Sequence, residues 1–169
     1  KLPTRIKAIA SFLLFFICCQ GLFGYLTVSL KLLPIIVTGH LFGGFITLSL
    51  FFYLFLNTSD GIKNHQIGHL KILGGIALFA LLIQIFLGAW TSTNYASLAC
   101  VDFPTCQGTY MPEMNFSDGF NLSQEVGPNY LYGLLDNEAR VAIHYSHRVS
   151  ALILTLIFMV LITKLWFSN

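Results

Sequence analysis

The stretch LKILGGIALFALLIQIFLGAW, residues 70–90, decides the fold of this chain. After Lys71 it contains only apolar residues, glycines and one glutamine. A helix needs about 20 apolar residues to cross the ~30 Å hydrocarbon core of a bilayer. A backbone in lipid must satisfy its own hydrogen bonds, and a run of this length is too long for a barrel strand. The stretch therefore predicts a transmembrane helix.

Three further apolar runs, at residues 8–26, 33–56 and 140–167, resemble this one in length. Of the 169 residues, 56% are hydrophobic and only 9% are charged, and the mean hydropathy is +0.75. A soluble domain has about 25% charged residues, so the composition excludes that class. We predict an all-α fold: one integral membrane four-helix bundle over residues 1–169. Its expected helices are 8–27, 33–56, 70–92 and 139–167, and residues 93–138 form a long extracytoplasmic loop.

The first run follows Lys1, Arg5 and Lys7, as the apolar region of a secretory signal peptide would. Its end, CCQGLFGY (18–25), lacks a clean small-residue cleavage site. We therefore expect a retained helix. Because the sequence starts with Lys1 and not with Met, a processed protein or a fragment of a longer one is also expected.

The positions of Lys and Arg predict the orientation, because cytoplasmic loops are enriched in both. With the N-terminus inside, six basic residues lie on the inner side, and two, Lys31 and Arg140, lie on the outer side. We expect both termini inside and the loop 93–138 outside. The compact loops favour a bacterial cytoplasmic membrane over a mitochondrial inner membrane. The inner set is Lys1, Arg5, Lys7, Lys63, Lys71 and Lys164.

Two histidines, His40 and His147, fall within the expected helices, each about seven residues or ~10 Å from the outer end. An ionisable side chain in hydrocarbon is costly, which makes each a functional-site hypothesis. Two buried imidazoles in a chain with few charges suggest iron ligation by haem. The alternative is that each ring only hydrogen-bonds a neighbouring helix. Gly39, Gly43 and Gly44 favour haem ligation at His40, since they let a flat ring lie against the helix.

In the fourth helix, His144, His147 and Arg148 share one face, because they are spaced three and four residues apart. An Arg beside an axial ligand can pair with a haem propionate through its forked donors. Arg140, about two turns outward, is a candidate for the same contact. An ordinary interfacial anchor is the equally weighted alternative for Arg140.

A short pattern occurs twice. Gln20-x-x-x-Gly24-x-x-Thr27-x-Ser29 matches Gln84-x-x-x-Gly88-x-x-Thr91-x-Thr93. Each copy ends an odd-numbered helix at the outer surface, and each is followed by a helix with an intramembrane His. The pattern suggests a parallel repeat, as found in other membrane bundles.

Cys100 and Cys106 lie close together in the expected outer loop, on either side of Pro104. An outward location permits a disulfide. Two Cys without a nearby His make a poor zinc site. A structural disulfide is favoured, with a redox-active pair as the alternative.

Six ordered motifs closely resemble the haem A synthase family, and together they cover nearly the whole chain. They are LTVSLKLLP (26–34), VTGHL (37–41), GAWTSTNYA (88–96), ACVDFPTCQG (99–108), PEMNF (112–116) and ARVAIHYSHR (139–148). Members have eight transmembrane helices in two pseudo-symmetric four-helix halves. They oxidise a methyl group of haem O to a formyl group, giving haem A for cytochrome oxidase. This chain resembles helices three to six, the middle of such a protein.

The resemblance implies haem O as substrate and haem b as cofactor, each held between two His on alternate helices. His40 matches the second ligand of the N-terminal half, and His147 matches the first ligand of the C-terminal half. Cys100 and Cys106 match the outer-loop pair of that second half. His144 stands where the N-terminal half carries a catalytic glutamate, which makes it the candidate catalytic residue.

The sequence lacks the family's helices one, two, seven and eight, and with them that glutamate and one partner for each His. The expected function is therefore that of a haem A synthase or a fragment of one, and activity of this chain alone stays open. A non-catalytic membrane haem protein for electron transfer is the alternative, followed by a structural subunit without cofactor. The implied partners are haem O, the lipid bilayer, haem O synthase and cytochrome oxidase assembly factors, with no nucleic acid.

Overall fold

The computed structural model describes residues 3–58 and 68–167 of the chain. Within these residues the regular structure is helical, apart from an isolated bridge between Cys106 and Thr109. The four long helices are each long and apolar enough to cross a membrane, so the chain is an all-α, multi-pass membrane protein. They are α1 (Thr4–Ser29), α2 (Pro34–Thr58), α3 (Lys71–Thr93) and α5 (Asn137–Trp166), with short helices η1 (Gly68–Leu70) and α4 (Phe116–Gly119).

The observed helices extend beyond the apolar runs. The first begins at Thr4, directly after Pro3, and includes the polar turn with Arg5 and Lys7. Hydropathy marks only the part of a helix that suits lipid, whereas Arg and Lys are good helix formers outside it. Two basic residues used to predict the orientation, Lys1 and Lys63, lie outside the described residues.

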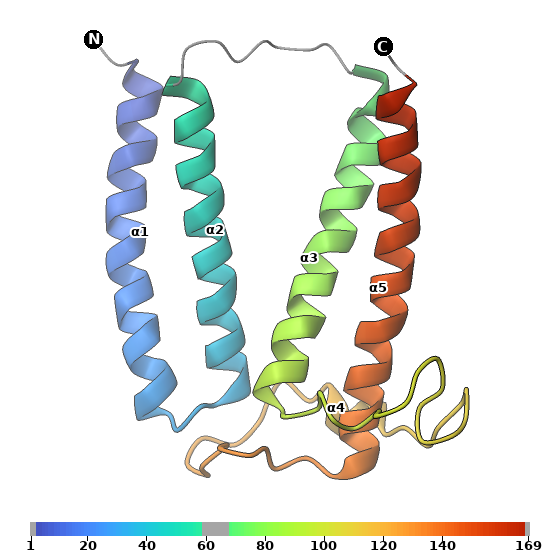
Figure 1. Cartoon of the computed structure of the whole chain (residues 1–169). Coiled ribbons are helices and arrows are strands. Elements are labelled where there is room, and N and C mark those ends of the chain that lie inside the picture. The colour runs from blue at the N-terminus through green and yellow to red at the C-terminus, as the bar shows by residue number, and fades with distance from the viewer. Residues whose placement is uncertain (1–2, 59–67, 168–169) are drawn as a thin grey trace.

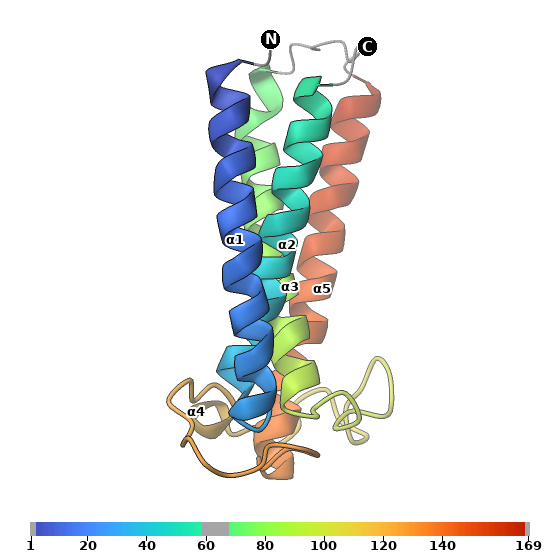
Figure 2. The same cartoon turned by 90° about the vertical axis from the view of Figure 1, so that its left-hand side faces the viewer.

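The long helices form two antiparallel hairpins, α1 with α2 and α3 with α5, and α2 also contacts α3 (Figure 1). The N- and C-terminal ends lie at one end of the molecule, and the segment between α3 and α5 lies at the other (Figures 1 and 2). The tight turn between α1 and α2 places Lys31 and Leu32 at φ 52° and 64°. The long segment is attached to this turn, because Lys31 Nζ donates to the Gly127 carbonyl at 2.8 Å.

The buried core sits where the long segment covers the second hairpin. Trp90, at the end of α3, is fully buried, and its indole N–H donates to the Gly119 carbonyl of α4 at 2.7 Å. Elsewhere the long helices expose many large apolar side chains, which suits contact with lipid or with further helices. The core cluster around Trp90 also contains Ala96 and Ile143, with Ile35, Phe86, Phe120 and Leu135 packed against it.

Gly119 allows α4 to approach α5 closely. A Cβ atom at this position would lie 2.8 Å from the Ala139 carbonyl oxygen, a backbone atom that cannot move aside. We expect Gly119→Ala to displace α4, weaken the Trp90 hydrogen bond and destabilise the protein by about 1–3 kcal/mol. Thermal unfolding in detergent, followed by tryptophan fluorescence, measures the loss. Gly75→Ala is the control, because nothing lies within 4 Å of that Cβ; equal stability of the two variants would contradict the prediction.

Candidate functional site

His147 lies between the two helices of the second hairpin, with its ring against α3. A Cβ atom at Gly88 would lie only 3.2 Å from Cε1 of His147, so the absent side chain is what admits the ring. One turn earlier on α3, the amide nitrogen of Gln84 lies 3.1 Å from Nδ1 of His147. The imidazole thus contacts the Gln84 amide through Nδ1 and packs against α3 where Gly88 has no side chain.

His40 occupies the matching place in the first hairpin. A Cβ atom at Gly24 of α1 would lie 3.3 Å from Cε1 of His40. One turn earlier, the Gln20 amide packs on Gly43, where a side chain would overlap with it. Among the described residues, Nδ1 of His40 and Oε1 of Gln20 are both buried without a hydrogen-bond partner.

The twofold sequence pattern therefore has a structural counterpart. In both hairpins, the Gly of Gln-x-x-x-Gly receives an imidazole from the next long helix. His40 also lines an apolar groove of about 260 Å³ with Leu41, Gly44, Phe45 and Leu48. In the described parts of the chain, no cluster of three or more His, Cys, Asp or Glu could hold a bare metal ion. One imidazole per hairpin suits haem better than a bare ion, since the porphyrin itself supplies four nitrogen ligands.

The predicted disulfide between Cys100 and Cys106 is present, and it closes a small loop near the N-terminal end of α5. Arg148 holds this loop through three backbone carbonyls. Its Nη1 donates to Asp102 O at 2.6 Å and Thr105 O at 3.1 Å, and its Nη2 donates to Cys100 O at 2.6 Å. Pairing of Arg148 with a propionate stays a prediction, and together with His144 these carbonyls already occupy most of its five N–H donors.

His144 lies between Arg148 and the same loop. Its Nδ1 faces the Cys100 N–H at 3.2 Å, and its Nε2 faces Nε of Arg148 at 3.2 Å. A neutral imidazole can accept at only one nitrogen, so it satisfies one of these donors at a time. The position beside the disulfide loop was not expected from the sequence, and a catalytic role for His144 stays a prediction.

Arg140 lies in the first turns of α5 and donates from Nε to the Leu135 carbonyl at 2.7 Å. This bond joins the end of the long segment to the helix that follows it. Both alternatives for Arg140, the interfacial anchor and the propionate contact, stay predictions.

Asp102 organises the disulfide loop from within. Its carboxylate accepts from the Thr105 hydroxyl, from Gln107 N–H at 2.7 Å and from Gly108 N–H at 2.9 Å. The Thr105 hydroxyl above all, and then the Gly108 N–H, lower the pKa of Asp102 from 3.8 to about 2. Donors that favour the charged form have this effect on a carboxyl group.

We expect the hydrogen bonds of the Asp102 carboxylate to survive acidification to a lower pH than an ordinary Asp would allow. Because the pKa is lowered in the folded state, the carboxylate stabilises the loop fully above its ordinary value of 3.8, and this stabilisation is lost as the pH falls towards about 2. The Gly108 amide shift of ¹⁵N-glycine-labelled protein reports the midpoint. Asp102→Asn should abolish the titration, and a midpoint near 3.8 in the unmodified protein would contradict the expectation.

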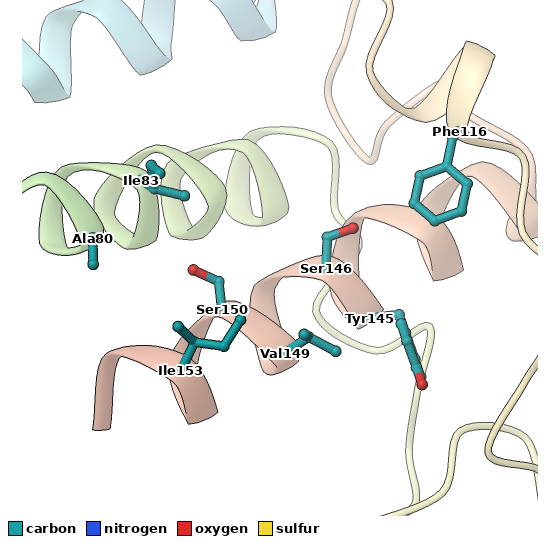
Figure 3. A pocket seen from close by; sticks show the side chains of 8 residues that line it. All are labelled: Ala80, Ile83, Phe116, Tyr145, Ser146, Val149, Ser150 and Ile153. Atoms are coloured by element: carbon teal, nitrogen blue, oxygen red, sulfur yellow. The ribbon is translucent and has the colours of Figure 1, made fainter. Parts of the chain in front are cut away.

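A second groove, of about 440 Å³, lies on another face of the second hairpin (Figure 3). None of its lining residues is a candidate site residue in the sequence analysis, although Phe116, Tyr145 and Ser146 lie within the quoted motifs. Apolar side chains at helical spacing do not distinguish a groove from a lipid-facing surface. Its lining consists of Ala80, Ile83, Phe116, Tyr145, Ser146, Val149, Ser150 and Ile153.

Comparison with known proteins assigns the family. The profile of COX15-CtaA, described as a cytochrome oxidase assembly protein, matches residues 1–169, which is the whole chain. The chain belongs to the COX15-CtaA family. The haem A synthase family predicted from the motifs is therefore confirmed, and membership implies a haem cofactor.

A haem A synthase that the chain resembles is about twice as long as the chain. The chain is 38% identical over 172 residues to a haem A synthase from Shewanella oneidensis (strain MR-1). The match covers 100% of this chain and 52% of that protein, so the chain spans about half of the relative's length. No solved structure shows a significant match to the chain.

Proposed function

We propose that this chain is part of a haem A synthase that oxidises a methyl group of haem O to the formyl group of haem A. The observation that carries the proposal is the pair of imidazoles, His40 and His147, each seated on a glycine at the matching place of its hairpin. The hydrogen bond of His147 with Gln84 is at Nδ1, which leaves Nε2 of that ring available to a ligand. Family membership supplies the link from these rings to haem.

His40 and His147 would each hold a haem through one ring nitrogen, one of them the haem O substrate and the other a haem b cofactor. When bound, haem supplies the redox chemistry, for which the protein provides ligation, orientation and a dry surrounding. Gly24 and Gly88 admit the two rings, and the apolar helix faces exclude water. Arg148 keeps the disulfide loop closed over the outer end of the second hairpin.

We also propose an orientation of the chain in the membrane. Both described ends lie at one end of the molecule, and the outer segment lies at the other (Figure 1). Combined with the distribution of basic residues, this supports inner termini and an outer loop in a bacterial cytoplasmic membrane. Haem O synthase would supply the substrate, and cytochrome oxidase assembly factors would receive the product.

Haem extraction tests the function. The protein encoded by the complete reading frame is produced in membranes that contain haem O, and the extracted haems are identified by mass. Conversion of haem O to haem A supports the proposal. Unchanged haem b without conversion would instead support an electron-transfer protein, and protein without a Soret band would support a subunit that binds no haem.

A further inference from the structure

We infer that Gln84 and Gln20 are positioning residues that set the tautomer of His147 and His40, so that Nε2 of each ring is the iron-binding nitrogen. The inference rests on the proposed haem function. It concerns two side chains to which neither the family assignment nor the expected ligand set gives a role.

The contact between Gln84 and His147 is the first observation. The two side chains come from facing helices, 63 residues apart, and join at Nδ1 of the ring. Metal-ligating His residues commonly donate their second ring N–H to a protein oxygen, which fixes the tautomer and raises the basicity of the ligand. Gln84 is the described residue placed to do this, because it forms the hydrogen bond of the His147 ring within the described parts of the chain.

Amide chemistry determines the direction of that bond. In the structure the nitrogen of the Gln84 amide faces Nδ1, and Oε1 is buried without a partner among the described residues. A ring that binds iron through Nε2 must carry its proton on Nδ1. A half-turn of the amide then presents Oε1 as the acceptor for that proton. With the amide in that orientation, the bond favours the tautomer with its proton on Nδ1, which leaves Nε2 as the iron-binding nitrogen.

The first hairpin has the same residue types at the matching positions. Gln20 precedes Gly24 by one turn, as Gln84 precedes Gly88, and both Gln20 Oε1 and His40 Nδ1 are buried and unpartnered in the described structure. No hydrogen bond joins Gln20 to His40 there, in contrast to Gln84 and His147. The role of Gln20 therefore rests on its matching position and on these two unpartnered atoms, and the contact between Gln84 and His147 carries the inference.

Substitution of Gln84 in the haem-loaded, full-length protein tests the inference. Gln84→Leu keeps the approximate size and removes the acceptor, whereas Gln84→Glu keeps an acceptor at the same length. We expect Gln84→Leu to lower haem affinity roughly 10-fold or more, the usual size of such effects. It should also raise the midpoint potential of the remaining haem, because a less basic ligand stabilises ferric iron less. Gln84→Glu should retain haem with a midpoint potential at or below that of the unsubstituted protein.

Gln107→Leu is the matched control, since it makes the same chemical change on an exposed side chain of the outer loop. Gln20→Leu should affect the haem associated with His40 and leave the other spectrum unchanged. Haem affinity and potential that stay unchanged in Gln84→Leu would overturn the inference, as would an equal loss in Gln84→Glu. Unsubstituted protein that binds no haem would overturn the proposed function itself, which is a distinguishable result.

Discussion

Replacing His147 with alanine is expected to remove haem from the second hairpin. The substitution deletes the ring nitrogen that would hold the haem and leaves Gln84 with no ring to orient. Changes to residues that only support a ligand cost about 10–100-fold in affinity, so loss of the ligand itself should cost more. The ratio of haem to protein and the Soret spectrum of the purified protein measure the effect.

Two comparisons make this result specific. Ser146→Ala, on the neighbouring residue, should leave haem content unchanged, because its hydroxyl only donates to the Ala142 carbonyl within α5. Added imidazole should partly restore the spectrum of His147→Ala, since Gly88 leaves room for a ring at this position. Full haem content and an unaltered spectrum in His147→Ala would remove this residue from the ligands.

Arg148→Met should open the disulfide loop without breaking the disulfide. The guanidinium donates three hydrogen bonds to loop carbonyls, and bonds from charged donors are worth about 1.5–3 kcal/mol each. Losing them together should cost at least about 2 kcal/mol locally, or roughly 30-fold faster amide exchange. Hydrogen exchange at Cys100, Gln107 and Gly108 measures this directly, because each of these amides is hydrogen-bonded within the assembly.

Arg148→Lys should give an intermediate result, because an ammonium group is a point charge and cannot span three carbonyls as a planar fork does. Arg140→Gln is the matched control: it removes the bond to the Leu135 carbonyl and should leave exchange at residues 100–108 unchanged. Protection of these amides that survives in Arg148→Met would show that the disulfide alone orders the loop.

The membrane helices were predictable because the bilayer acts on each segment separately. A run such as residues 70–90 must form a helix in lipid whatever its neighbours are, since its backbone has no other hydrogen-bond partner. The disulfide was predictable for a similarly local reason, because Cys100 and Cys106 are only six residues apart. The family followed from ordered motifs, and the comparisons confirm it.

The contacts around the candidate site were harder to predict from the sequence. The sequence placed His144, His147 and Arg148 on one face of a helix, which suggested that Arg148 faces a haem propionate. It did not indicate that the guanidinium bonds to carbonyls 43 to 48 residues away. A carbonyl leaves no trace in the sequence, because every residue has one, so this partner could not be inferred from residue types.

By itself, then, the sequence determined that four segments cross a membrane, that two of them carry an imidazole, and to which family the chain belongs. Only the tertiary structure decided that Gln84 contacts Nδ1 of His147 and that the Trp90 indole donates to the Gly119 carbonyl of α4. The physical reason is that burial in lipid depends on the composition of one segment alone. A contact between helices depends on how each helix is rotated about its axis and on the register of the hairpin, which are set only when the small residues of both helices pack together.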